Sequence, residues 1–194
     1  MSDTPPADLK SRLREEAFAR RDALDRDWRR EASAAIAERV LRLPEFATVD
    51  PVGGYWPMRS EVDPRPILEA LVAEGRTAAL SQIIHPHLSW RQWRPGDVLV
   101  HGGLGVKEPG PDAPEVFPRA LLVPLAAFDR RGGRLGYGKG HFDRAIAELS
   151  NLHDVLAIGL AFSGQEVEEV PQEPHDRRLD VVVTEQALLR IGRE

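Results

Sequence analysis

Apolar residues in the first quarter of the chain recur every three or four positions, which is the spacing of amphipathic helices. One helix is predicted over residues 7–25 and a second over 27–43, with Asp25 or Asp27 as its cap and Pro44 as its end. The apolar face predicted for the first helix consists of Leu9, Leu13 and Ala17. Most of the arginines in this helix pair are expected to face solvent. Residues 1–6 are polar and contain two prolines, so we expect a disordered start.

Further along the chain, apolar runs bounded by glycine or proline predict strands that alternate with helices. The predicted strands cover residues 49–55, 77–84, 120–126, 155–161 and 180–184, and the predicted helices cover 64–74, 142–152 and 185–191. Segment 85–118 is rich in proline and glycine, so we expect an irregular, functional loop. This alternation predicts an α/β fold, with one domain over 1–194 and a mostly parallel sheet that has helices on both faces.

Composition narrows the range of functions without identifying one. At 194 residues the chain is long enough for one sizeable core but short for two domains. Its formal net charge of −5 argues against general nucleic-acid binding, and the absence of cysteine excludes disulfides, thiolate catalysis and cysteine-based zinc sites. No apolar run reaches the length of a membrane span, and the N-terminus lacks the apolar core of a signal peptide. We therefore expect a cytoplasmic protein that binds neither nucleic acid nor membrane.

A glycine-rich segment, residues 128–143, joins a predicted strand to a predicted helix. Its sequence, FDRRGGRLGYGKGHFD, places Arg134, Lys139, His141 and Asp143 among several glycines. Glycine lets backbone N–H groups approach an anion closely, and a helix N-terminus adds a partial positive charge. Because parallel sheets bind ligands at the carboxyl ends of their strands, the segment is predicted to hold nucleotide phosphates.

Other interpretations of this segment are weaker. Its spacing nearly matches a P-loop, but Gly140 stands where a P-loop has the Ser or Thr that binds magnesium. The spacing also departs from the dinucleotide-binding fingerprint, and a hairpin-like turn that uses glycine for geometry alone is the structural alternative. A divalent cation beside phosphate needs oxygen ligands, and the candidates are Asp143 and Asp176. Without a metal, Asp143 would be a helix cap and Asp176 a turn residue.

Taken together, residues 10–184 resemble the 5-formyltetrahydrofolate cyclo-ligase family, also called methenyltetrahydrofolate synthetase. The most specific match is LVPLAAFD at 122–129 followed by RLGYGKGHFDR at 134–144, where family members typically show R-L-G-x-G-x-G-[YH]-[YF]-D-R. Weaker matches occur in the family's order. They are Lys10, Arg14, Tyr55, Trp56, Pro57, Glu61, Val62, Asp63, Trp93, 105–109, 158–162, Gln165, 171–176 and 182–185.

The resemblance implies a Rossmann-like, NagB/RpiA-like architecture and an ATP- and Mg²⁺-dependent cyclisation of 5-formyltetrahydrofolate to 5,10-methenyltetrahydrofolate, with release of ADP and phosphate. Lys10, Arg14 and Arg134 match catalytic positions. The implied ATP contacts are Lys10, Arg14, Arg134, Leu135, Gly136, Tyr137, Gly138, Lys139, Gly140, His141 and Phe142. The implied folate contacts are Trp56, Glu61, Tyr137 and His141, and Asp143 and Asp176 are the implied magnesium ligands. The expected partners are therefore ATP and a reduced folate, and we expect a monomer or weak dimer.

Several roles stay open at this level. Lys139 either contacts phosphate or points to solvent, and His141 either binds the folate or fills space, with binding favoured over acid–base catalysis. Trp90 and Trp93 either anchor the 85–118 segment in the core, which is favoured, or line the folate pocket. A zinc site is disfavoured because the spacing is wrong; its candidate ligands are His85, His87 and His175. Rival functions are a non-catalytic binding member of the same fold and a phosphotransferase for another small substrate.

Overall fold

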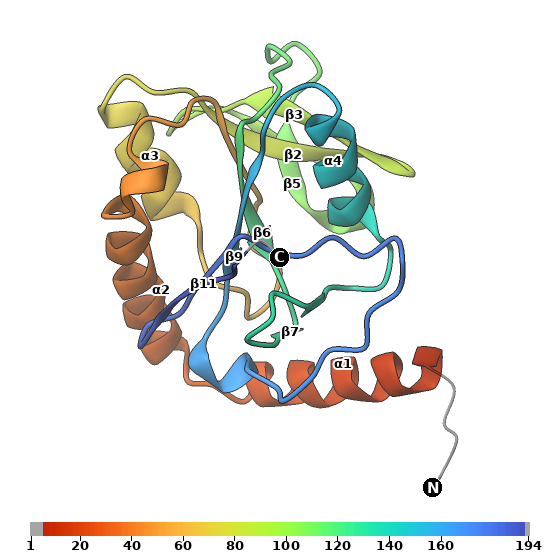
Figure 1. The fold of residues 1–194 in the computed structure, drawn as a ribbon. Coiled ribbons are helices and arrows are strands. Elements are labelled where there is room, and N and C mark those ends of the chain that lie inside the picture. Colours follow the sequence, from red (N-terminus) through yellow and green to blue (C-terminus); the bar gives the residue numbers. More distant parts are fainter. Residues whose placement is uncertain (1–5, 193–194) are drawn as a thin grey trace, which may run out of the picture.

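A seven-stranded sheet runs through the middle of the molecule in the order β11-β10-β9-β6-β1-β2-β3 (Figure 1). The computed structural model describes residues 6–192. Neighbouring strands in the centre of the sheet are parallel; these strands are β1 (Val52–Gly54), β2 (Ala78–Ile84), β6 (Ala120–Pro124), β9 (Leu156–Leu160) and β10 (Val181–Val183). Antiparallel strands β3 (His87–Gln92) and β11 (Leu188–Arg190) form its two edges. The mostly parallel sheet predicted from the sequence is therefore confirmed.

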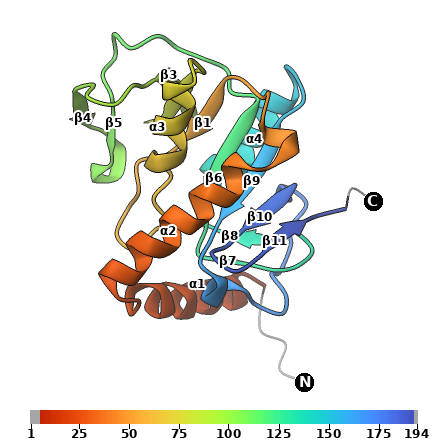
Figure 2. The ribbon, with the colours of Figure 1, turned by 90° about the vertical axis from the view of Figure 1, so that its left-hand side faces the viewer.

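Helices cover both faces of this sheet, as predicted (Figures 1 and 2). Helices α2 (Arg26–Leu41) and α3 (Arg65–Ala73) pack on one face, and α4 (His141–Ser150) packs on the other. Side chains alternate between the two layers along each strand, so Leu122 of β6 belongs to the core under α2 and α3. Asp25 caps α2, because its carboxylate accepts the backbone N–H groups of Asp27 and Trp28.

The segment 85–118 is not irregular, and that expectation is wrong. It contains β3, which forms a hairpin with β2, and a small two-stranded sheet of β4 (Leu99–His101) and β5 (Lys107–Pro109). These strands are short or lie at an edge with one polar side, so they lack the long apolar runs that identify buried strands. Trp90 and Trp93 are buried, which confirms their predicted place in the core.

The predicted closing helix over 185–191 is also wrong, because this segment forms β11, which pairs with β10. The Thr184 hydroxyl accepts the backbone N–H groups of Gln186 and Ala187, and the resulting tight turn sends the chain back along β10. Ala187, Leu188 and Leu189 favour a helix locally, but pairing with the preceding strand outweighs that preference. Short 3-10 helices occupy other connections; they are η1 (Pro44–Phe46), η2 (Gly103–Gly105) and η3 (Ser163–Gln165).

Helix α1 (Pro6–Asp22) lies across one end of the sheet, beside the hairpin of β7 (Ala127–Phe128) and β8 (Arg134–Leu135) (Figure 1). The disorder expected for residues 1–5 lies outside the described residues, and Pro6 already belongs to the helix. Within residues 6–192, no helix is both long enough and apolar enough to cross a membrane.

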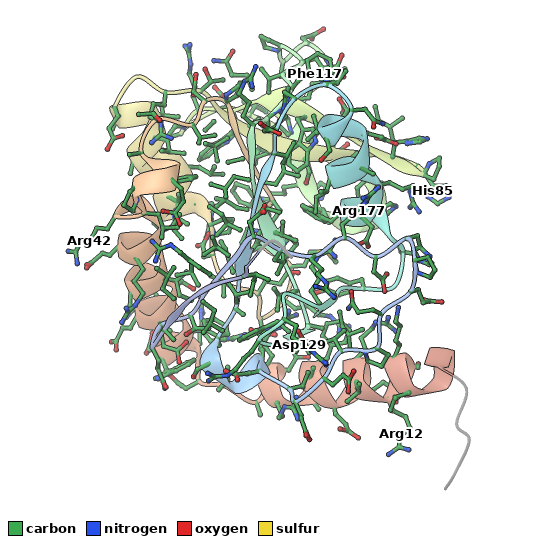
Figure 3. All side chains as sticks on the ribbon, in the orientation of Figure 1. Arg12, Arg42, His85, Phe117, Asp129 and Arg177 are labelled. Atoms are coloured by element: carbon green, nitrogen blue, oxygen red, sulfur yellow. The ribbon has the colours of Figure 1, made fainter. Side chains whose placement is uncertain are left out.

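The inner face predicted for α1 is partly wrong. Leu9 is exposed, whereas Lys10, Ala17 and Arg21 are buried. Other basic side chains of α1 do face solvent, as Arg12 does in Figure 3. The helix therefore turns a partly cationic face toward the protein, which an apolar pattern does not reveal.

Candidate active site

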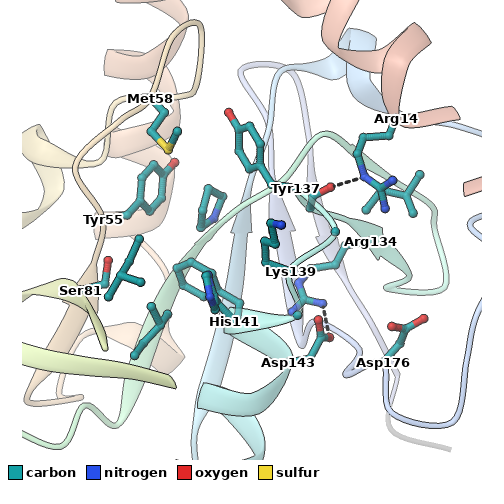
Figure 4. Close-up of a pocket in the computed structure, with 18 of the residues that line it drawn as sticks. Arg14, Tyr55, Met58, Ser81, Arg134, Tyr137, Lys139, His141, Asp143 and Asp176 are labelled. Carbon is teal, nitrogen blue, oxygen red and sulfur yellow. Dashed lines mark hydrogen bonds and ion pairs between the residues drawn. The ribbon is translucent and has the colours of Figure 1, made fainter. Parts of the chain in front are cut away.

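One cleft contains every residue that the sequence analysis predicts for binding or catalysis. Figure 4 shows part of its lining, including Arg14, Arg134 and Asp143. It opens between α1, the glycine-rich loop, the segment that follows β1, and residues 173–176. The nominated residues that line it are Lys10, Arg14, Trp56, Glu61, Arg134, Leu135, Gly136, Tyr137, Gly138, Lys139, Gly140, His141, Phe142, Asp143 and Asp176. Segments more than 160 residues apart in sequence thus meet at one place, since Lys10 bonds to Asp176.

The glycine-rich segment is a hairpin followed by a loop, not a direct connection from strand to helix. β7 and β8 form the hairpin, and the buried Asp129 carboxylate holds its turn by accepting the backbone N–H groups of Arg131 and Gly133. Here glycine serves geometry alone, as the structural alternative proposed. Residues 136–140, between β8 and α4, form the loop that lines the cleft, which we call the glycine loop. In it Gly138 and Gly140 have φ 82° and 63°, which are left-handed conformations that favour glycine.

Gly140 immediately precedes α4, so the N-terminus of this helix opens into the cleft. The first backbone N–H groups of a helix have no partner within the helix, and they attract anions. Asp143 is not the helix cap, because the cap residue is Gly140 and Asp143 lies within the first turn. Its Oδ1 instead accepts Arg134 Nη1 at 2.8 Å and the backbone N–H of Arg177 at 2.9 Å (Figure 4).

Cationic side chains line the same part of the cleft. Arg134 is buried, which lowers its pKa, while Asp143 and Asp176 act to raise it. Lys10 Nζ lies 2.6 Å from both Glu173 Oε2 and Asp176 Oδ2. Burial acts to lower the pKa of Lys10, but hydrogen bonds to these two carboxylates outweigh it and raise the pKa. Both cations therefore stay charged beside carboxylates that balance them.

Arg14 binds the glycine loop directly. Its Nε donates to the Gly136 carbonyl oxygen at 2.7 Å, and its guanidinium lies against Gly138, where an added Cβ would come within 3.3 Å of it (Figure 4). A side chain at Gly138 would therefore push Arg14 away from the loop.

The acidic residues offer oxygen donors, which suit a hard cation such as Mg²⁺. Asp143 and Asp176 both line the cleft, but each carboxylate already binds a cationic side chain. The ligand atoms of Glu173, His175 and Asp176 lie within 4.8 Å of one another. Glu173 was missed from the sequence, although it lies in the matched segment 171–176, because its contact with Lys10 joins opposite ends of the chain.

The other side of the cleft holds Trp56, Glu61 and Tyr137. Glu61 is 8% exposed, and its Oε2 accepts the backbone N–H of Met58 at 2.7 Å. Burial raises the pKa of Glu61 to about 7, against the opposing effects of this hydrogen bond, Arg21 and Tyr137. The Tyr137 ring packs 4.9 Å from the Phe18 ring, which orients its hydroxyl.

His141 lies edge-on to His85, with ring centroids 5.9 Å apart, and its buried Nε2 has no hydrogen-bond partner among the described residues. Burial lowers its pKa, with Arg144 acting in the same direction, so the ring is neutral near pH 7. Lys139 lines the cleft with an exposed side chain. His87 binds Glu148 at 2.5 Å and does not join His85 and His175 in a cluster of metal ligands within the described chain.

Arg21 is an exception to the expectation that most arginines of the first two helices face solvent. It is 1% exposed and donates hydrogen bonds to Ser60, Leu125 and Tyr137. Its spacing from Lys10, Arg14 and Ala17 is the signal that identifies it, since steps of four, three and four residues place all four on one helix face.

The model of the 5-formyltetrahydrofolate cyclo-ligase family matches residues 6–185. The 5-formyltetrahydrofolate cyclo-ligase of Escherichia coli K12 is 31% identical over 85% of this chain and 94% of its own, and that of Mycolicibacterium smegmatis is 33% identical over 69% and 72%. The solved structure of Aquifex aeolicus 5,10-methenyltetrahydrofolate synthetase is 32% identical with a TM-score of 0.82, over 96% of this chain and 95% of its own.

Proposed function

The chain belongs to the 5-formyltetrahydrofolate cyclo-ligase family, and we propose that it converts 5-formyltetrahydrofolate to 5,10-methenyltetrahydrofolate in an ATP- and Mg²⁺-dependent reaction that releases ADP and phosphate. The observation that supports this most strongly is the single cleft, which places a cationic glycine loop beside an apolar wall with one buried carboxylate.

The reaction needs an activated formyl group. A formamide carbon is a poor electrophile and its oxygen is a poor leaving group, so ATP transfers its γ-phosphoryl group to that oxygen and leaves as ADP. The neighbouring folate amine then attacks the formyl carbon, the ring closes, and the oxygen leaves as phosphate. Phosphoryl transfer depends mainly on positioning and on stabilising charge, so no protein nucleophile is required.

The ATP side of the cleft is proposed to supply that charge stabilisation. Lys10, Arg14 and Arg134 are proposed to face the phosphates together with the N–H groups at the start of α4. Asp143 and Asp176 would hold Mg²⁺, which when bound neutralises the charge of the transferring phosphoryl group. Their oxygen donors suit this ion, and Glu173 is a further donor beside Asp176.

The folate side is proposed to recognise the pterin ring. A carboxylate only accepts hydrogen bonds, so the Glu61 carboxylate complements the amino and ring N–H donors of a pterin. Trp56 and Tyr137 offer aromatic surface in the same cleft. The buried, unpartnered Nε2 of His141 is available for a folate or phosphate contact, which favours a binding role.

The direct test is to incubate the purified protein with 5-formyltetrahydrofolate and MgATP and to follow the absorbance of the methenyl product, with parallel assays of ADP and phosphate. We expect product in equal amounts with ADP, and no product without ATP or after chelation of Mg²⁺. A folded protein that binds ATP but forms no methenyl product would refute the proposal and favour a non-catalytic member. ATP consumption with sugar phosphates, not competed by reduced folates, would favour another phosphotransferase.

A further inference from the structure

Arg21 is a fully buried cation that the proposed chemistry does not use. It lies in the last turn of α1, and its guanidinium donates to Ser60 Oγ at 3.0 Å, to the Leu125 carbonyl oxygen at 3.2 Å and to the Tyr137 hydroxyl at 3.1 Å. Ser60 in turn donates to the Asp22 carboxylate. Burying a charge is costly unless it is hydrogen-bonded, so this network keeps Arg21 in place.

The network joins two segments of the cleft wall that are distant in sequence. Ser60 precedes Glu61, and Tyr137 belongs to the glycine loop, so one side chain of α1 holds both segments. Arg14, seven residues earlier on the same helix face, binds the Gly136 carbonyl next to Tyr137. Helix α1 therefore fixes both the backbone before Tyr137 and the hydroxyl at its far end.

The direction of the hydrogen bonds matters for Glu61. Arg21 can only donate, so the Tyr137 oxygen is the acceptor and the hydroxyl hydrogen is left to donate elsewhere. Tyr137 and Glu61 line the same cleft, and the Tyr137 hydroxyl and the charge of Arg21 both act to lower the pKa of the Glu61 carboxyl, against burial. Arg21 and Tyr137 thus favour the ionised form of Glu61.

We propose that Arg21 is a positioning residue for the folate half of the reaction: it orients Tyr137 and, through it, holds Glu61 as a hydrogen-bond-accepting carboxylate in the cleft. This inference rests on the proposed function, since it assumes that Glu61 receives the pterin donors. Other titratable or charged groups near Glu61 are Tyr55 after β1 and those of a second groove that Glu61 also lines, which are Arg26, Asp27, Arg29, Arg30, Arg59, Asp63 and Arg65.

The first test compares Arg21→Met with Arg20→Met, a matched change at the adjacent exposed position. For Arg21→Met we expect the KM for 5-formyltetrahydrofolate to rise about tenfold, because a charge-assisted network is lost, while the KM for ATP changes less than about twofold. The pH below which kcat/KM for the folate falls should also rise, because Glu61 loses the charge that lowers the pKa of its carboxyl. We call this low-pH part of the profile the acid limb. Equal effects on both substrates, an unmoved limb, or the same losses in Arg20→Met would overturn the inference.

Two further variants keep the inference testable if Arg21→Met does not fold. Arg21→Lys retains the charge and should retain the acid limb better than Arg21→Met, whereas Tyr137→Phe removes only the connecting hydroxyl and should shift the limb upward. In a Glu61→Gln background, Arg21→Lys and Tyr137→Phe should raise the folate KM little further, because their effect passes through Glu61. The inference would be overturned if Arg21→Lys and Tyr137→Phe raised the folate KM as much in the Glu61→Gln background as in the unmodified protein. An acid limb that does not move in Tyr137→Phe would also overturn it.

Failure of the proposed function gives a different result. If the unmodified protein makes no methenyl product, the activity is refuted whatever Arg21 does. Calorimetric binding of 5-formyltetrahydrofolate across pH 6–8, without ATP, then tests Arg21 independently. Binding that weakens for Arg21→Met and Tyr137→Phe with an upward shift of its pH midpoint, and that shifts less for Arg21→Lys, supports the positioning role, and unchanged binding overturns it.

Discussion

Glu61→Gln tests whether ionisation of the buried Glu61 carboxyl lowers the free energy of unfolding. Glu61 is 8% exposed, and burial raises the pKa of its carboxyl to about 7 from an ordinary 4.5. Between these pH values the folded protein holds a proton that the unfolded chain has released, so the free energy of unfolding must fall as the pH rises. At about 1.4 kcal/mol for each pH unit of pKa difference, the loss approaches about 3 kcal/mol by pH 8.

The glutamine variant should lack this loss, because its amide does not titrate. Urea unfolding of both proteins from pH 4.5 to pH 8 should therefore show the variant gaining about 3 kcal/mol relative to the unmodified protein as the pH rises. Other carboxylates affect both proteins alike and cancel in the difference. The exposed Glu69 offers a control, and Glu69→Gln should show no such trend. A Glu61→Gln difference that is constant across the pH range would refute the reasoning.

The remaining predictions concern the side of the cleft that is proposed to bind ATP. Arg14→Met should raise the KM for ATP about tenfold in steady-state assays, because the Gly136 carbonyl loses the hydrogen bond that Arg14 donates to it. Arg12→Met should leave the KM for ATP unchanged. Gly140→Ser should lower the free energy of unfolding in urea by about 1 kcal/mol, because residue 140 has a left-handed backbone conformation with φ 63°. Calorimetry should show no tighter binding of Mg²⁺ to this variant. Asp143→Asn should cost about 3 kcal/mol in the same unfolding assay, because buried Arg134 loses its ion pair; unchanged stability would contradict this.

The central strands were predictable because they are buried on both faces and therefore appear as continuous apolar runs, such as Leu121 to Val123 in β6. β11 was not, because its partner strand decides its conformation and its own residues favour a helix. The hairpin of β7 and β8 was considered only as the weaker alternative, because little in the sequence marks its strands. Each of its strands has only two residues, and the buried Asp129 that shapes its turn looks like any other acid beside glycine.

The site was predictable where its chemistry is local in sequence. Arg134 and Asp143 stand nine residues apart in one glycine-rich run, and they form an ion pair. Lys10 was placed there only through the family resemblance, and its partner Glu173 was missed because no local pattern links two residues 163 positions apart. Arg21 was missed because helix arginines are usually solvated, although it shares one helix face with Lys10, Arg14 and Ala17; its burial and its contacts show that this arginine is not solvated.

The charges of the cleft fall into two arrangements with different consequences. On the side proposed to bind ATP, Lys10 and Arg134 already have carboxylate partners, so incoming phosphates would compete with Asp176 and Asp143 for them. A divalent cation that takes up those carboxylates would free both side chains, so ATP affinity is expected to depend strongly on Mg²⁺. On the side proposed to bind the folate, Glu61 is a carboxylate whose raised pKa reflects burial, so donors from a bound pterin would compensate it directly. Folate affinity should therefore respond to pH near 7, and ATP affinity to the metal.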